Sequence, residues 1–189
     1  MISEDDIVRY IVDFSKEKQN QTTEMAKSIA DNVDPVVNFL RKDEPIQFVQ
    51  RGFILCENKI KELASKHIPD SNIHNLKFTK LLELVNKKGF LKDSETAPYK
   101  KLRDLRNEVA HHLEYQVKTK DATSIWDAFN REQREEIQRK SGMNRANAKD
   151  NPDILVKIMI LRLYTHLSHA IESESMRKDI NTLLSRQKH

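Results

Sequence analysis

Glycine and proline are scarce in this sequence, with three glycines and five prolines among 189 residues. Turns between β-strands rely on glycine, asparagine and proline, so this scarcity argues against a fold built from strands. Residue types that favour helices dominate instead, among them Leu, Lys, Glu, Arg, Gln and Ala, and 33% of the residues are charged. The composition predicts an all-α bundle of long helices joined by short loops.

Cysteine is nearly absent. The single Cys56 cannot form an internal disulfide, and we expect it to be a small core residue because it lies in an apolar helical stretch. The N-terminus carries acidic residues where a signal peptide has basic ones, and no stretch approaches the length of a membrane span. These absences predict a soluble, cytoplasmic protein. The net charge of +4 is too small to indicate a nucleic-acid partner by itself.

Apolar residues recur at helical spacing along most of the chain. They predict a first helix after Ser3, a second over residues 25–41, and a third that starts at Pro45 and ends before Pro69. The later helices are expected over residues 78–85 with Gly89 just after the helix end, from 96–98 to about 113, over 124–140, and from Pro152 to 171. Residues 114–123 and 141–152 are expected to be irregular.

A chain of this length is most simply one domain with a normal core. Its expected parts are an N-terminal helical extension over residues 1–43, a helical bundle over 44–172 and a C-terminal helical tail over 173–189. The sequence therefore predicts a single all-α bundle with extra N-terminal helices.

The stretch LRDLRNEVAHH, residues 102–112, places polar residues of unusual type inside a helical segment. At about 100° per residue, one face of this helix is apolar and predicts a core stripe. That stripe comprises Tyr99, Leu102, Leu105, Val109 and Leu113. An adjoining face carries Arg103, Asn107, Ala110 and His111, with Arg106 at the boundary beside the core. The segment thus has a bundle face and a face with residues that suit chemistry on phosphate.

The small Ala110 would let another helix approach this polar face closely, and the same helix of a second subunit would meet it about a two-fold axis. Arginine binds phosphate oxygens, histidine transfers protons near neutral pH, and asparagine can orient a phosphate or a ribose hydroxyl. The bare pattern is common in surface helices, however, and Asp104 and Glu108 could simply pair with nearby arginines.

The motif Arg106-Asn107-x-x-x-His111 resembles the signature of the HEPN superfamily, which is an arginine, a polar residue and then a histidine a few positions on. The preceding FTKLLELVNKKGFLKDS, a helix and a glycine turn before the motif helix, is also similar to HEPN proteins, including ones like the mannitol operon repressor. The resemblance covers roughly residues 45–112, with 154–171 as a closing helix.

This resemblance implies an all-α HEPN-like bundle that forms a homodimer and acts as a metal-independent endoribonuclease without a cofactor. Arg106 would bind and neutralise phosphate, His111 would transfer protons, Asn107 would position the RNA, and Arg103 would contact phosphate at the cleft edge. Many such proteins are toxins or phage-defence effectors, which implies an antitoxin or another protein partner. The alternative is a non-catalytic helical dimer that serves as a regulator or protein-binding module, as in the mannitol-repressor-like branch.

A second basic region follows Trp126 and suggests further phosphate contacts. The RNA-binding candidates there are Arg139, Lys140 and Arg145. A solvated helix with interspersed Glu132, Glu135 and Glu136 explains the same charges equally well.

The remaining histidines predict no metal site. His112 is expected to point toward the core, and His166 and His169 are expected at the surface or an interface, because no carboxylate or cysteine stands at suitable spacing beside them. Glu57 and Lys61 form an ordinary pair four residues apart. The chain has no glycine-rich phosphate loop and no zinc-spaced cysteines.

Overall fold

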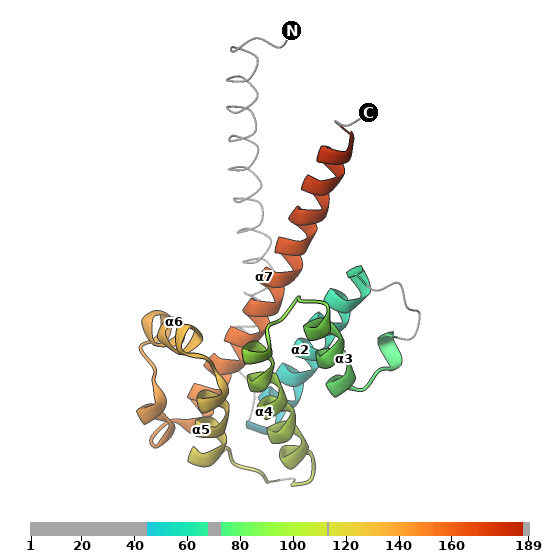
Figure 1. Ribbon diagram of the computed structural model, residues 1–189. Helices are drawn as coiled ribbons and strands as arrows, with labels where there is room; N and C mark the ends of the chain where they lie inside the picture. The colour runs from blue at the N-terminus through green and yellow to red at the C-terminus, as the bar shows by residue number, and fades with distance from the viewer. Residues whose placement is uncertain (1–44, 68–72, 113, 187–189) are drawn as a thin grey trace.

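The computed structural model describes residues 45–67, 73–112 and 114–186, and this part of the chain is helical without a strand (Figure 1). Its elements are α2 (Pro45–His67), η1 (Ile73–Asn75), α3 (Phe78–Lys87), α4 (Asp93–Ala110), α5 (Thr119–Ala128), α6 (Arg131–Ser141), η2 (Arg145–Ala148) and α7 (Pro152–Arg186). The all-α prediction is confirmed. The expected N-terminal extension, residues 1–43, lies outside the described residues.

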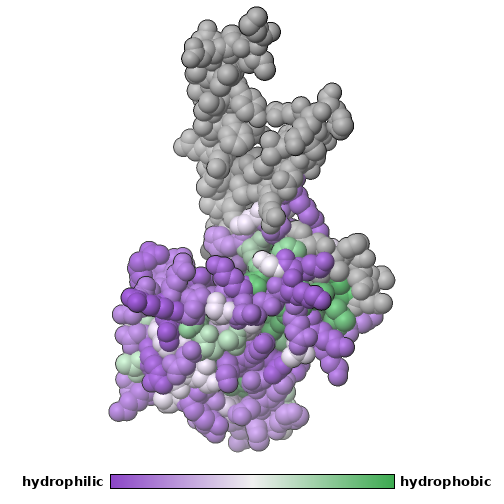
Figure 2. Space-filling model, viewed as in Figure 1, coloured by the Kyte–Doolittle hydropathy of each residue, from purple (hydrophilic) through white to green (hydrophobic). Residues whose placement is uncertain are grey.

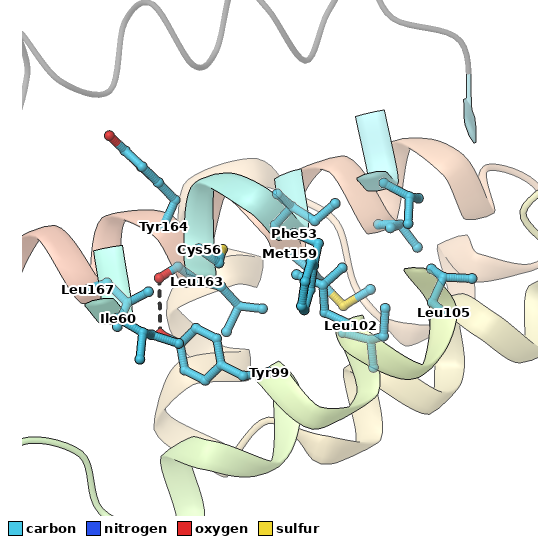
Figure 3. Close-up of a cluster of buried hydrophobic side chains, with 14 of the residues drawn as sticks. Phe53, Cys56, Ile60, Tyr99, Leu102, Leu105, Met159, Leu163, Tyr164 and Leu167 are labelled. Atoms are coloured by element: carbon cyan, nitrogen blue, oxygen red, sulfur yellow. Dashed lines mark hydrogen bonds between the residues drawn. The ribbon is translucent and has the colours of Figure 1, made fainter. Parts of the chain in front are cut away.

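The core forms where α2, α4 and α7 meet. Apolar side chains from the three helices point toward one another, among them Phe53, Leu102 and Met159 (Figure 3). Tyr99 is fully buried, and its hydroxyl donates to the carbonyl oxygen of Leu163 at 3.0 Å, which satisfies the one polar group of the ring. The face seen in Figure 1 is mostly hydrophilic, with a smaller hydrophobic area near α2 and α3 (Figure 2).

Cys56 is a core residue, as the sequence predicted. It is fully buried on α2, and burial raises the pKa of its thiol from 9.0 to about 12. A thiol with this pKa is protonated at neutral pH, and only the thiolate is a nucleophile. Cys56 therefore contributes packing to the bundle.

The crossing of α2 and α7 depends on Gly52. A Cβ atom at this position would lie 2.6 Å from Cγ2 of Ile160, well inside the normal contact distance. The absence of a side chain at Gly52 lets the two helices approach closely. Elsewhere, Gly89 follows α3 with a φ of 78°, the left-handed conformation expected of a residue just after a helix end.

The helix α7 has 35 residues, so it is about 52 Å long at 1.5 Å per residue. It runs continuously across the expected start of the tail at residue 173, and its C-terminal part extends beyond the other described helices (Figure 1). The expectation that no stretch approaches the length of a membrane span is wrong, because Pro152–Ser175 meets that description by length and composition. Half of this segment is buried inside the bundle, so core packing accounts for its apolar character.

The single helix expected over residues 124–140 is instead two helices. The chain is extended at Phe129, and Asn130 caps α6 by accepting a hydrogen bond from the backbone N–H of Gln133 at 2.9 Å. The side chain of Gln133 accepts in return from the backbone N–H of Asn130 at 3.2 Å. This reciprocal capping box stops one helix and starts the next, and Ile125, Trp126 and Phe129 are buried as predicted.

The motif helix α4 begins at Asp93, ahead of the expected start at 96–98. The backbone N–H of Lys92 donates to the Glu95 carboxylate at 2.8 Å, which stabilises an earlier first turn. Pro98 therefore lies inside the helix and is buried. The helix α5 likewise starts inside the stretch 114–123 that was expected to be irregular, and η2 lies inside 141–152.

Candidate functional site

The bundle face of α4 is formed as the sequence predicted. Tyr99, Leu102, Leu105 and Val109 are all buried, whereas Leu113 lies outside the described residues. This burial fixes the rotation of α4 about its own axis. The motif residues Asn107 and His111 consequently face solvent, and Arg106 is half-buried beside the core.

Arg106 is held in place by two neighbours. Its Nη1 donates to Oδ1 of Asn107 at 3.1 Å, and its guanidinium carbon lies 5.4 Å from the centroid of the Phe53 ring. The guanidinium has five N–H donors, and a contact with an aromatic ring leaves its edges available. Most of these donors can still bind an anion such as phosphate.

His111 lies at the end of α4, not within it. The backbone N–H groups of His111 and His112 bond to the carbonyl oxygens three residues earlier, at 3.2 and 3.4 Å, which tightens and ends the helix. The helix therefore stops at Ala110, three residues before its expected end. Within the described part of the chain, no side-chain hydrogen bond joins His111 to Arg106 or Asn107, and the imidazole is exposed.

A cleft of about 750 Å³ opens beside this helix end. Asn107 and His111 line one side, and Lys118 and Lys120 come from the start of α5. His112 also lines the cleft and is exposed, so the expectation that it points toward the core is wrong. The cause is the early end of α4, which releases His112 from the helical register on which that expectation rested.

Tyr115 connects the two helices below the cleft. Its hydroxyl lies 2.8 Å from Oδ2 of Asp121 and 3.1 Å from Oε2 of Glu108, and its one hydrogen donates to one carboxylate at a time. Burial, followed by these carboxylates, raises the pKa of Tyr115 above its usual value of 10.0, so the hydroxyl stays protonated at neutral pH. Sequence reasoning missed this residue. The nearest signal was Asp121, which accepts from the backbone N–H of Lys118 at 2.8 Å at the start of α5.

No protein-family model, curated protein or solved structure matches the chain. What the site can do therefore follows from its own residues. The end of α4 presents an amide and an imidazole in one cleft, together with ammonium groups from the start of α5. The Arg106 guanidinium does not line this cleft but donates to the amide of Asn107.

The other RNA-binding candidates lie elsewhere or have carboxylate partners. Arg145 Nε donates to Asp127 at 2.8 Å and lowers the pKa of that carboxyl. Lys140 Nζ lies 2.7 Å from Glu136, and Arg139 is an exposed neighbour on α6. Figure 1 shows α6 well separated from the C-terminal end of α4, so Arg139 and Lys140 do not reach the motif, and Arg145 on η2 does not line the cleft.

Arg103 differs from these candidates because it lies on α4 itself. Its Nη2 is 2.6 Å from Oδ1 of Asp104, the carboxylate partner that the sequence allowed for. Glu57 and Lys61 also form the expected pair, with 3.2 Å between Oε1 and Nζ.

His166 is more buried than the surface or interface position that the sequence indicated. It is half-buried on α7, with Nδ1 3.1 Å from the Tyr99 hydroxyl and Nε2 3.7 Å from the Glu95 carboxylate. Burial lowers the pKa of His166 below 6.5, although Glu95 opposes this shift. His169 is exposed, and among the described residues no three His, Cys, Asp or Glu side chains are placed to hold a metal ion.

Proposed function

We propose that the chain is a HEPN-type, metal-independent endoribonuclease that acts as a cytoplasmic homodimer. The observation that carries this proposal is the arrangement at the end of α4, where Asn107 and His111 line one cleft and Arg106 donates a hydrogen bond to Asn107. A toxin or phage-defence role, with an antitoxin as partner, extends the same proposal through the family resemblance.

The reaction requires proton transfer at two oxygens. One imidazole removes the proton from the ribose 2′-hydroxyl, whose oxygen then attacks the adjacent phosphorus. The bond from phosphorus to the 5′-oxygen breaks, an imidazolium donates a proton to that oxygen, and a cyclic phosphate remains. Arg106 stabilises the negative charge that develops on the phosphate oxygens, and Asn107 orients the substrate.

A second copy of the chain completes this site. Arg106 and His111 are five residues apart, which separates them by about 140° around α4. One copy therefore directs them to different sides of the helix, and it offers one His111 for two proton transfers. Two copies that meet along the face with Ala110, which is exposed, would bring one His111 to each oxygen and the Arg106 of one copy toward the His111 of the other.

The proposal is tested by incubating labelled RNA, tRNA included, with the purified protein in EDTA and analysing the product ends. We expect cyclic-phosphate ends from the wild type. His111→Ala should lower the cleavage rate about 10²- to 10⁴-fold, the usual contribution of a general acid or base. Arg106→Ala should lower it to a similar extent, because it removes a charge that stabilises the transition state.

His112→Ala is the matched control, because it removes an adjacent exposed histidine of the same cleft. We expect it to retain most of the wild-type rate, with all variants showing the wild-type helical content by circular dichroism. Cleavage by His111→Ala and Arg106→Ala at the wild-type rate would overturn the mechanism. If the wild type cuts no RNA, the chain is better described as a non-catalytic dimer that binds a regulatory or protein partner.

A further inference from the structure

The cleft beside His111 continues along the side of α4. A second cavity of about 380 Å³ lies between α4 and α5 and is lined by Lys101, Ser124 and Lys120. Glu108 and Lys120 line both cavities, so the two are adjacent, and together they are called the groove. From Lys101 to His111 this groove follows α4 for about 15 Å, at 1.5 Å per residue.

Three exposed lysines distinguish this groove from the basic region on α6 and η2. Lys101, Lys118 and Lys120 make no ion pair with any carboxylate in the described part of the chain. Lys118 Nζ lies 5.6 Å from the centroid of the Tyr115 ring, which leaves its charge uncompensated. On α6 and η2, by contrast, Lys140 and Arg145 are paired with Glu136 and Asp127, as shown above.

Two of the four acidic residues that line the groove, Asp104 and Asp121, are engaged by donors of the protein. Asp104 is paired with Arg103 at 2.6 Å, and Asp121 accepts from both the Tyr115 hydroxyl and the backbone N–H of Lys118 at 2.8 Å. Glu108 lies 3.1 Å from the same hydroxyl. Hydrogen bonds and an ion pair therefore offset Asp104 and Asp121, whereas Glu108 shares the Tyr115 hydrogen with Asp121. Glu114 is exposed at the His111 end of the groove. The ammonium groups remain available to an anion.

The groove meets the face assigned to the dimer only at its end, where Asn107 and His111 line it. Lys101 and Glu108 are seven residues apart, so they lie on the same side of α4. At about 100° per residue, Ala110 and Arg106 lie on the opposite side of His111 from Lys101 and Glu108. An RNA strand bound in the groove would therefore reach His111 without crossing the surface where the second copy of the chain packs.

We propose that the groove between α4 and α5 binds single-stranded RNA, with Lys101, Lys118 and Lys120 contacting its phosphates. At about 3.4 Å per phosphate in a stacked strand, 15 Å of groove holds roughly four nucleotides. This inference gives the substrate path for the proposed nuclease, and the reaction it serves rests on that proposed function. It replaces Arg139, Lys140 and Arg145 as the main RNA contacts.

The test measures binding separately from cleavage. A fluorescent single-stranded oligonucleotide of about eight nucleotides with 2′-O-methyl riboses cannot undergo attack by the 2′-oxygen, so anisotropy reports its affinity alone. The variant Lys101→Ala/Lys118→Ala/Lys120→Ala is compared with Arg139→Ala/Lys140→Ala/Arg145→Ala. Each variant removes three positive charges from exposed positions, and the second is the matched control.

We expect the groove variant to weaken binding at least about tenfold and to lower the slope of log K against log salt by about two, at roughly 0.7 per lost phosphate contact. The control should change the affinity less than about threefold. Equal losses in both variants, or no binding by the wild type, would overturn the inference. If the triple groove variant loses helical content, Lys101→Glu and Lys120→Glu, made singly, should each weaken binding more than Arg139→Glu.

Cleavage of unmodified RNA separates the two proposals. Groove-dependent binding without any cleavage by the wild type would overturn the nuclease and retain the groove. Cleavage whose KM and kcat are unchanged in the groove variant would overturn the groove and retain the nuclease.

Discussion

At the scale of single residues, the surroundings of a histidine decide its protonation state. His166 lies between Tyr99 and Glu95 on one side and faces the charges of Arg162, His169 and Glu136. Burial disfavours the charged imidazolium and outweighs the attraction of the two carboxylates, so the pKa of His166 is lowered. The ring is therefore neutral in the folded protein at neutral pH.

This lowered pKa predicts a pH-dependent stability. Between the folded pKa and 6.5, the unfolded chain holds a proton on His166 that the folded chain does not. The stabilisation is fully present above pH 6.5, and the free energy of unfolding falls as the pH drops below that value. Urea unfolding between pH 5 and pH 8 should show this fall, and His166→Asn should reduce it.

His169→Asn is the matched control, since His169 is exposed and one turn further along α7. Burial also lowers the pKa of His169, so this variant should reduce the fall as well, but less than His166→Asn does. An unchanged pH dependence in His166→Asn would contradict the assignment.

The exposure of His111 could be predicted from the sequence, because the apolar stripe of its own helix shows which face is buried. The same could not be done for His166, whose surroundings come from Tyr99 and Glu95, about seventy residues earlier. The same limit applies to Tyr115, whose carboxylate partners become visible only once α4 and α5 are packed. Periodicity tells which side of a helix is covered, but not which polar group from another helix lies there.

At the scale of elements, the close contact of α2 with α7 depends on one missing side chain. Gly52→Ala would place a Cβ atom 2.6 Å from the β-branched Ile160. Overpacking costs about 1–3 kcal/mol, against roughly 1 kcal/mol gained from the helix propensity of alanine. We expect the free energy of unfolding to fall by about 1 kcal/mol, measured by urea denaturation.

Asn58→Ala is the control for this change, because Asn58 is exposed on the same helix. It should leave the free energy of unfolding unchanged or slightly raised, as alanine has the higher helix propensity. An increase of equal size in both variants would show that the helices adjust around the new methyl group.

Most helices were predictable from the sequence, since each carries its own apolar stripe. The break between α5 and α6 was missed, although the Asn130 and Gln133 pair is a recognisable capping box. The apolar residues on both sides of the break kept helical spacing, which hid it. The early end of α4 had no comparable signal, because no glycine or proline follows Ala110 before α5 begins.

At the scale of the whole molecule, the proposed dimer depends on the small exposed residue in the motif face. Ala110→Arg would place two bulky cations where two copies of α4 meet, near Arg103 and Arg106. Like charges brought together at an interface cost several kcal/mol, so we expect the dimer Kd to rise at least about tenfold. Sedimentation equilibrium checks this, and cleavage should fall with the fraction of dimer.

Gln138→Arg is the matched control, adding the same side chain at an exposed position of α6. It should leave the dimer Kd and the cleavage rate unchanged. A wild-type protein that is monomeric at concentrations where it cleaves RNA would contradict the dimeric site.

The groove could not be predicted from the sequence either, because it depends on how two helices pack. Lys118 and Lys120 stand in a stretch that read as irregular, and their approach to Lys101 depends on how α5 packs against α4. The basic region after Trp126 was easier to notice, because its charges are close together in the sequence. Its ion pairs appeared only in the folded chain.

The long helix α7 also sets when the protein can fold during synthesis. Its residue Met159 packs against Phe53 of α2, so the core joins parts of the chain about 100 residues apart. At roughly 5–20 residues per second, the ribosome takes about 5–20 s to make that interval, and α2 has no core partner from α7 until then. The motif on α4 is translated midway, yet its bundle closes only after α7 emerges. The cleft beside the end of α4 would thus form only after α7 has been made.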